Sequence, residues 1–321
     1  MTKLKLTILV VAIVLLALVP PVAHAIDEPF YLSLFARIMV FAIAAVSLDL
    51  ILGYGGMISF GHAAYLGTGA YAVAIMSFYE IDNGWLQLFM AIVASALVAL
   101  VIGAICLRTS GIYFIMVTLA FTQMLYFLGI SLEVYGGDDG MDTNRSEFVT
   151  WFDLTDDVNL YYLILIFLIL SVYIGYRLIN SRFGMVIRGS QSNDQRMQTI
   201  GFPTFRYKLA SFVIAGTMCG VAGFLLANLT EFLTPEYMHW FRSGEIMIMM
   251  IMGGMGTLFG PMFGAAVYIL LEEWIPEILE LIHTGWGEHW WVAFGPVLIL
   301  LVLFAKRGLW GLLPDRKRHD G

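Results

Sequence analysis

Long apolar stretches alternate with short polar segments along most of the chain. Eight stretches have the roughly 17–25 residues of a helix that crosses a bilayer. They cover 4–23, 31–52, 60–79, 86–106, 111–130, 159–178, 207–229 and 288–305, and a further apolar segment at 240–275 is interrupted by glycines. The pattern predicts an all-α, polytopic membrane protein of about eight to ten transmembrane helices, with residues 1–321 as a single transmembrane domain.

Charged residues are sorted between the two alternating sets of loops. Lysine and arginine are retained on the cytoplasmic side during insertion. If Lys3 and Lys5 lie inside, all 17 lysine and arginine residues are cytoplasmic except Arg37, Arg145 and Arg242. The 24 acidic residues face outward except Asp49, which lies within a span, and Asp194, Asp315 and Asp320. We therefore expect both termini in the cytoplasm.

Composition supports a membrane protein. Hydrophobic residues make up 60% of the chain and charged residues 13%, which is too apolar for a soluble domain of this length. The net charge of −7 arises from the outward loops and indicates no nucleic acid partner. Membrane lipid is the expected surrounding.

The first apolar stretch has two interpretations. Lys3 and Lys5, the apolar run and the small-residue triplet Ala23-His24-Ala25 also fit a cleavable signal peptide. However, the run from Leu4 to Val19 is long for a signal, and Pro20-Pro21 would end it as a helix. We expect an uncleaved first transmembrane helix.

Two glycine-rich breaks interrupt the apolar pattern, one at 53–62 and one at 253–261. Each contains Gly-Gly-Met, then a hydroxyl residue, a Phe-Gly pair and a Gly/Ala-rich helix. Matching interrupted helices in two halves of a membrane protein indicate a transport pathway. The alternative is close helix packing, which we prefer for any single glycine, whereas the matched pair favours a pathway.

Several polar residues accompany these breaks. The candidate pathway residues are Asp49, Gly55, Gly56, Ser59, His62, Gln123, Gly253, Gly254 and Thr257. An intramembrane acid indicates function, yet we prefer a role for Asp49 as acceptor for free backbone donors at Gly55–Ser59. His62 either lines a path or bonds locally, and Gln123, with Thr122, either lines a pore or joins helices.

The sequence gives little support for enzyme chemistry. No nucleophile–base pair and no cluster of metal ligands stands out, and Cys106 and Cys219 lie far apart in apolar spans. We expect no catalytic residues and no metal.

Five segments carry a resemblance to a known family. They are 47–75 (SLDLILGYGGMISFGHAAYLGTGAYAVAI), 107–124 (LRTSGIYFIMVTLAFTQM), 135–141 (YGGDDGM), 182–225 and 242–265. Together they are similar, in the same order, to the hydrophobic amino acid uptake family of ABC importer permeases, and they resemble its LivM-type branched-chain amino acid permeases.

This resemblance implies a bacterial inner (plasma) membrane permease that translocates branched-chain amino acids. The expected partners are a second related permease, two cytoplasmic ATPase subunits and an external or periplasmic amino-acid-binding protein. The chain has no G-x-x-x-x-G-K-[ST] loop. We therefore expect a transport subunit that is not an enzyme and has no cofactor of its own, with ATP bound by the partner ATPases.

Two loops have expected roles. The resemblance places the ATPase coupling helix in the cytoplasmic loop 180–208, with Arg188, Asp194, Arg196 and Gly201 as candidates. Alternatively, its arginines only follow the positive-inside rule. Family members tend to have Glu and paired Ala where this chain has 192–194 (Ser-Asn-Asp) and 196–197 (Arg-Met). The acidic external loop 131–158 suits either docking of the binding protein or simple solvation.

Two other functions stay open. A urea or short-chain amide permease of the same superfamily has similar glycine-rich breaks. An ion-coupled secondary transporter would need no ATPase. Paired intramembrane carboxylates would favour the latter, and only Asp49 is evident.

Overall fold

A computed structural model describes residues 3–26, 28–148, 154–283, 285, 287–304 and 308–311. The helices are α1 (Lys3–Ile26), α2 (Phe30–Ile51), α3 (His62–Phe78), α4 (Gly84–Cys106), α5 (Ile112–Ser131), α6 (Asp157–Ile179), α7 (Arg182–Thr199), α8 (Thr204–Thr230), α9 (Trp240–Gly253), α10 (Gly260–Ile282), α11 (Trp290–Phe304) and α12 (Gly308–Gly311). Short 3₁₀ turns are η1 (Glu133–Tyr135), η2 (Pro235–Met238) and η3 (Gly287–His289). Two strands, β1 (Met141–Asp142) and β2 (Phe232–Leu233), pair antiparallel. The predicted all-α architecture is confirmed.

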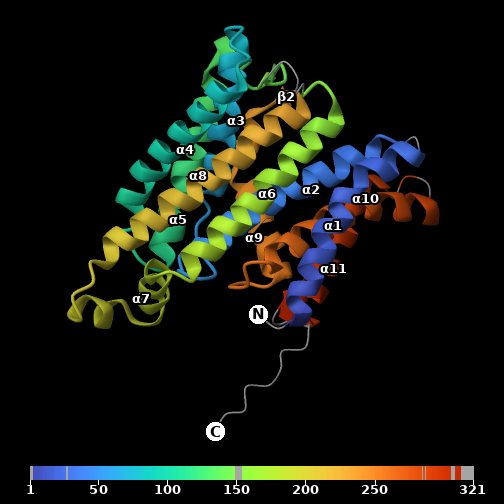
Figure 1. The fold of residues 1–321 in the computed structure, drawn as a ribbon. Coiled ribbons are helices and arrows are strands. Elements are labelled where there is room, and N and C mark those ends of the chain that lie inside the picture. The colour runs from blue at the N-terminus through green and yellow to red at the C-terminus, as the bar shows by residue number, and fades with distance from the viewer. Residues whose placement is uncertain are drawn as a thin grey trace.

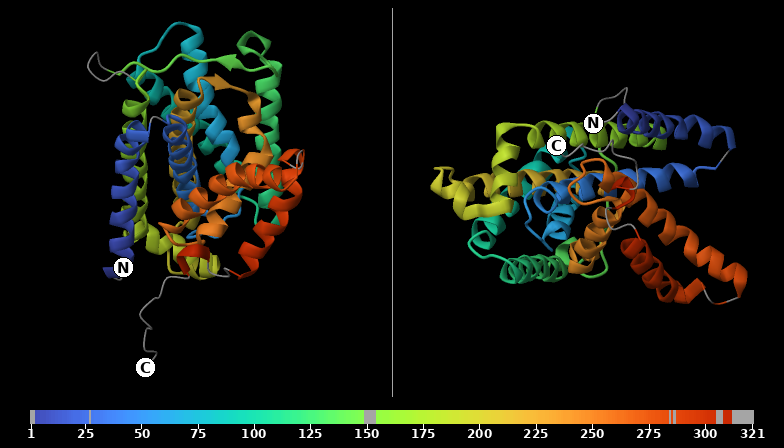
Figure 2. Two further views of the ribbon diagram at one scale, coloured as in Figure 1. Left: turned by 90° about the vertical axis from the view of Figure 1, so that its right-hand side faces the viewer. Right: turned by 90° about the horizontal axis from the view of Figure 1, so that it is seen from below.

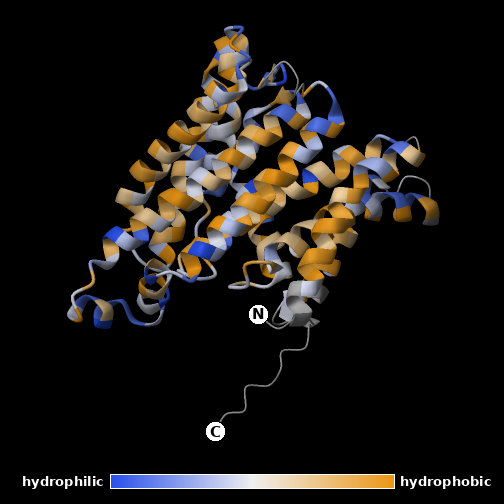
Figure 3. Cartoon of the chain, viewed as in Figure 1, coloured by the Kyte–Doolittle hydropathy of each residue, from blue (hydrophilic) through white to orange (hydrophobic). Residues whose placement is uncertain are grey.

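The molecule has two polar ends with an apolar zone between them. Figure 3 shows hydrophilic residues over α7 at one end and over the loops around β2 at the other. We call these the α7 end and the strand end. Within the described residues, six helices are long and apolar enough to cross a membrane: α1, α2, α4, α5, α6 and α8. The structure is consistent with a multi-pass membrane protein.

Helix α2 forms the centre of the bundle (Figures 1 and 2) and contacts α6, α8, α9 and α10. Of the most apolar 18-residue stretch of α2, 89% is buried, whereas 11% of the corresponding stretch of α1 is buried. A helix that is apolar on every face is stable only when surrounded. Uniform apolarity alone does not decide which helix is central, because α1 is more apolar than α2 (mean hydropathy 2.6 against 2.2) and lies at the periphery.

Small residues allow α3, α4 and α8 to pack closely. A side chain at Gly69 would overlap the backbone carbonyl of Gly220, and one at Gly220 would overlap Ser95. Without a hydrophobic effect between helices in lipid, such close approach is the main source of helix association. The packing interpretation therefore holds for Gly69, although Gly69 lies in the helix that directly follows the first break.

Helix α1 continues through Pro20 and Pro21 to Ile26, so the prediction that these prolines end the helix was wrong. Each proline leaves the carbonyl four residues earlier without its helical donor. Those carbonyls belong to Leu16 and Ala17. Two tyrosines of α6 donate to them instead: Tyr161 Oη lies 2.8 Å from the Leu16 oxygen and Tyr162 Oη lies 3.3 Å from the Ala17 oxygen.

We expect the double variant Tyr161→Phe, Tyr162→Phe to loosen α1 from the bundle. Two partly buried carbonyls would lose their donors, at up to about 1–3 kcal/mol each. Thermal unfolding of the purified protein should show a clearly lower midpoint. The matched control is Tyr173→Phe with Tyr176→Phe, because these α6 side chains are 58% and 46% exposed. Equal midpoints for the two double variants would contradict this role.

Arg145 organises the loop at the strand end. Its guanidinium forms ion pairs with Glu231 (2.6 Å) and Asp157 (2.8 Å) and donates to the carbonyls of Leu154 and Thr155. It therefore connects the beginning of α6 with the end of α8. The acidic loop 131–158 is thus partly held by an internal cation, while its residues 149–153 lie outside the described residues.

Candidate translocation site

The first break returns the chain from the end of α2 to the interior of the bundle. Residues 52–61 are not helical, and α3 begins only at His62. Phe60 needs backbone partners in this apolar setting, and two helices supply them. Its N–H donates to Thr118 Oγ1 at 3.2 Å, and its carbonyl accepts from Thr122 and Ser243, each at 2.8 Å. Side chains of α5 and α9 therefore replace the missing helical bonds.

The beginning of α3 is satisfied in the same way. Gly61 N–H donates to Ser59 Oγ at 3.0 Å, and Ala63 N–H donates to Ser243 Oγ at 2.8 Å. Orphan donors at a helix start require such acceptors when water is excluded. Ser59, a predicted site residue, thus has a local capping role.

The second break separates α9 from α10. Helix α9 has 14 residues, about 21 Å, which is shorter than the roughly 30 Å hydrocarbon layer. The chain then turns with Gly254 at φ 122° and Gly256 at φ 73°, values that favour glycine. Thr257 Oγ1 donates to the Gly254 carbonyl at 2.5 Å. The segment 240–275 therefore enters and returns as predicted, with its turn at the predicted glycines.

The two breaks touch each other. Asp49 Oδ1 accepts from the Gly256 N–H at 2.7 Å, and Tyr54 Oη accepts from the Leu258 N–H at 3.1 Å. The preferred role of Asp49, accepting from a free backbone donor, is found, but the predicted partner was wrong. The donor comes from the second break, 207 residues away, instead of from Gly55–Ser59. Asp49 and Tyr54 thus connect the two halves of the chain.

The first break also contacts α7. Gln191 Nε2 donates to the Gly53 carbonyl at 3.4 Å, and a side chain at Gly56 would come within 2.9 Å of Gln191 Cγ. Gly53 in turn lies against Gly256, because a side chain on it would come within 2.5 Å of the Gly256 nitrogen. A continuous set of contacts therefore runs from α7 through the first break to the second.

Helix α7 consists of two helical pieces. Its backbone leaves helical geometry at Asn193 (φ −161°, ψ 100°), and Asn193 Oδ1 accepts from the Arg196 N–H at 2.9 Å. Met197 of the second piece packs against Gly189 of the first. Val186 and Ile187 are buried while Met185 is 57% exposed. One face of α7 thus packs on the bundle and the other is free for a partner.

The four coupling candidates have different environments. Arg188 donates to the Ile179 carbonyl at the end of α6 (3.2 Å), and Asp194 pairs with Lys208 (2.9 Å). Arg196 is exposed. Gly201 has φ 98°, and a Cβ atom added to it would have no heavy atom within 4 Å. Arg188 and Asp194 therefore maintain the loop. Both arginines are exposed, but Arg196 has no side-chain hydrogen bond or ion pair among the described residues, whereas Arg188 has two hydrogen bonds.

The remaining pathway candidates are His62, Gln123, Gly55 and Gly253. His62 is fully buried against Tyr65, and its ring nitrogens have no hydrogen-bond partner among the described residues. It therefore does not line an open path in this conformation. Gln123 is half-buried, and it is its neighbour Thr122 that reaches the first break. Gly55 and Gly253 are buried against backbone atoms.

Sequence reasoning missed the residues that hold the breaks in place: Tyr54, Thr118, Gln191 and Ser243. For Thr118 and Ser243, a hydroxyl side chain inside an apolar helix was the available signal. Glu245 was predicted to face outward with the other acidic residues. It is instead 5% exposed within α9 and pairs with Arg242. Asp49 is therefore not the only buried acid, although the partner of Glu245 is an arginine.

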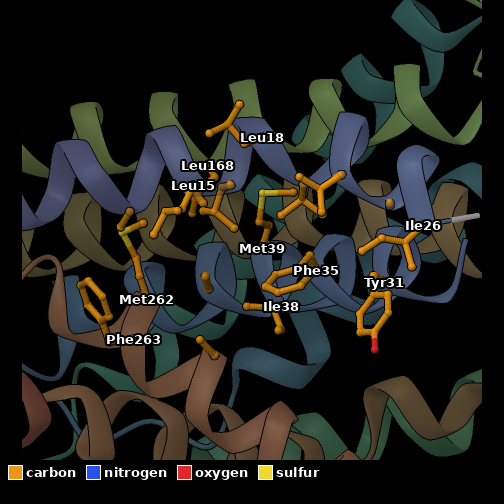
Figure 4. Close-up of a pocket in the computed structure, with 17 residues that line it drawn as sticks. Leu15, Leu18, Ile26, Tyr31, Phe35, Ile38, Met39, Leu168, Met262 and Phe263 are labelled. Atoms are coloured by element: carbon orange, nitrogen blue, oxygen red, sulfur yellow. The ribbon is translucent and has the colours of Figure 1, made fainter. Parts of the chain in front are cut away.

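A large apolar cavity lies away from these breaks. It has a volume of 640 Å³ and is bounded by α1, α2, Leu168 of α6 and the beginning of α10. Figure 4 shows its labelled side chains, all apolar except for the Tyr31 hydroxyl at one end. A zwitterionic solute would lose its hydration there without gaining polar partners. We therefore do not assign this cavity to the transport path.

Comparison with known proteins identifies the family. Residues 30–304 match the model of the branched-chain amino acid transport system permease component. The chain belongs to this family. The match includes both breaks and α7.

Curated relatives agree over most of the chain. It is 24% identical to the high-affinity branched-chain amino acid transport system permease LivM of Salmonella typhimurium, over 84% of this chain and 68% of the relative. Identity to LivM of Escherichia coli K12 is also 24%, over 88% and 71%. The permease LivH of E. coli K12 is 23% identical, over 84% and 91%. No solved structure matched the chain.

Proposed function

We propose that this chain is one of two permease subunits of an ATP-driven importer of branched-chain amino acids. The relatives named for such systems include both LivM and LivH proteins, which supports pairing with a second, related permease. Two ATPase subunits at the α7 end and an amino-acid-binding protein at the strand end complete the proposed complex. ATP would bind only to the ATPase subunits.

One observation supports this mechanism most directly: α7 contacts the first break through Gln191, and the second break is bonded to Tyr54 of the first break and to Asp49 near the end of α2. A movement of α7 is thereby transmitted to both interrupted helices. Alternating access would follow if the ATPases displace α7 on binding and hydrolysing ATP. Bistable packed elements, connected in this way, convert small shifts into switching.

Orientation is testable by labelling. We propose a bacterial inner membrane location with the α7 end in the cytoplasm, on the basis of the lysine and arginine distribution. A cysteine at Asp139 is expected to react with an impermeant thiol reagent added to intact cells. A cysteine at Gln191 should react only after the membrane is opened. External labelling at position 191 would show that the α7 end faces outward and would contradict the proposed orientation.

The coupling role predicts a specific defect for Arg196→Glu. This exposed residue has its side chain free for a partner surface, so charge reversal should reduce substrate-stimulated ATP hydrolysis at least tenfold, about 1.4 kcal/mol, without changing stability. The measurement is ATP hydrolysis by the reconstituted complex. Arg177→Glu, another exposed arginine at the α7 end, is the matched control. Normal substrate-stimulated ATP hydrolysis in Arg196→Glu would contradict a coupling role and leave this arginine explained by the positive-inside rule alone.

The strand-end loop 131–158 is the proposed docking surface for the binding protein. Its outward acidic residues and its fixed attachment through Arg145 support a stable platform. A binding protein would then deliver substrate to the same end at which α2 and α6 begin.

The overall proposal is tested by uptake in proteoliposomes that contain both permeases, both ATPases and the binding protein. Leucine, isoleucine or valine should accumulate only with ATP. Uptake of urea or a short amide in their place would favour the related permease class. Accumulation driven by an ion gradient without ATPases would favour a secondary transporter.

A further inference from the structure

A small cavity with charged walls lies near the strand end. Its volume is 220 Å³, below the roughly 300–1,000 Å³ of pockets for drug-sized ligands. It lies where α2 and α9 begin and where α8 and α10 approach their ends. Its walls include Arg37, Arg242 and Glu273, beside the apolar side chains of Phe41, Leu226 and Leu229.

The two guanidinium groups are held in place but keep free donors. Arg242 pairs with Glu245 and lies over the rings of Phe41 (5.8 Å) and Tyr237 (5.6 Å). Arg37 pairs with Glu272 at 3.1 Å. A guanidinium carries five N–H donors in a fixed plane, so each arginine has donors beyond its ion pair. Such groups bind carboxylates well.

Glu273 supplies the opposite charge. It is half-buried, lines the same cavity and has no ion-pair partner among the residues that the structure describes. An ammonium group is the natural partner for an unpaired, partly desolvated carboxylate. The cavity thus joins carboxylate-binding groups, an ammonium-binding group and an aliphatic wall within the space of one small solute.

We propose that this cavity is a binding site for the free amino acid before it reaches the breaks. Arg37 and Arg242 bind the α-carboxylate, Glu273 binds the α-ammonium, and Phe41, Leu226 and Leu229 contact the aliphatic side chain. Asp49 lies twelve positions after Arg37 in α2, about 18 Å along the helix. A substrate that enters at the strand end therefore meets this site first. The inference rests on the proposed function.

The experiment measures equilibrium binding of radiolabelled leucine to the assembled complex in nanodiscs, without binding protein. Glu273→Gln removes the ammonium partner and should weaken binding about tenfold, as expected for one charge-assisted hydrogen bond. Glu277→Gln is the matched control, because Glu277 lies one turn further along α10 and is exposed. Leu229→Trp should fill the cavity and also weaken binding, with thermal stability measured for every variant.

Two leucine analogues test the charge assignment. In the wild type, neither 3-methylbutylamine, which lacks the carboxylate, nor 4-methylpentanoate, which lacks the ammonium, should compete at concentrations where leucine does. In Glu273→Gln, 4-methylpentanoate should compete nearly as well as leucine.

Three results would overturn the inference. One is equal leucine affinity in stable Glu273→Gln and Glu277→Gln complexes. Another is absence of direct leucine binding to a wild-type complex that transports leucine. The third is an effect of Glu273→Gln confined to the affinity for the binding protein, which would make the cavity part of a protein-docking surface. By contrast, a fully assembled wild-type complex that transports no branched-chain amino acid would refute the proposed function itself.

Discussion

Replacing Gly254 with leucine is expected to abolish uptake by preventing assembly of the complex. Gly254 adopts φ 122° and ψ 103°, a conformation that L side chains rarely adopt. It is also buried against Gly308 of α12. Backbone strain costs about 1–3 kcal/mol, and the buried position leaves little room for a leucine side chain. Size-exclusion chromatography should show little complete complex, with a lower thermal midpoint for what remains.

Gly56 provides the contrast at the first break. Its φ of 67° is also positive, but it is exposed and its neighbour is the flexible side chain of Gln191. Gly56→Asn should assemble, because asparagine tolerates the left-handed region. Gly56→Leu should reduce uptake more than assembly, because it displaces Gln191 from Gly53. A stable, fully assembled Gly254→Leu complex would refute the distinction between the two sites.

Sequence was sufficient to locate both breaks, because a glycine cluster in an apolar helix is a local property of the chain. It was not sufficient to show that the breaks touch. The Asp49–Gly256 bond joins positions 207 residues apart, and nothing near Asp49 distinguishes that donor from Gly55–Ser59. The contact depends on how α2 packs against α9 and α10, which is a property of the whole bundle.

Prolines and arginines illustrate the same limit. Pro20-Pro21 would end an isolated helix, yet the Tyr161 and Tyr162 hydroxyls replace the missing donors. That pairing is visible only when α1 lies on α6. Likewise, charge sorting assigned Arg37 and Arg242 to the outward side. It did not predict that both would form ion pairs and line one cavity.

Removing the Asp49 carboxylate is expected to disconnect the two breaks. In Asp49→Ala, the Gly256 N–H loses its acceptor in a buried setting, at about 1–3 kcal/mol. Tyr54 would then be the remaining direct hydrogen bond between the breaks among the residues described. Uptake should fall at least tenfold in the reconstituted importer, and the thermal midpoint should decrease. Wild-type uptake in a stable Asp49→Ala complex would show that this bond is dispensable.

Asp49→Asn separates the structural role from an ionisable one. Asparagine keeps an acceptor oxygen for Gly256 but cannot carry a negative charge or exchange a proton. If Asp49 serves as a backbone acceptor, the variant should retain most of its ATP-dependent uptake and its stability. If the carboxylate instead carries a coupling ion, Asp49→Asn should be as inactive as Asp49→Ala while remaining stable. The comparison of the two variants therefore decides between an ATP-driven importer, in which α7 moves the breaks, and an ion-coupled transporter, in which Asp49 does so by titrating.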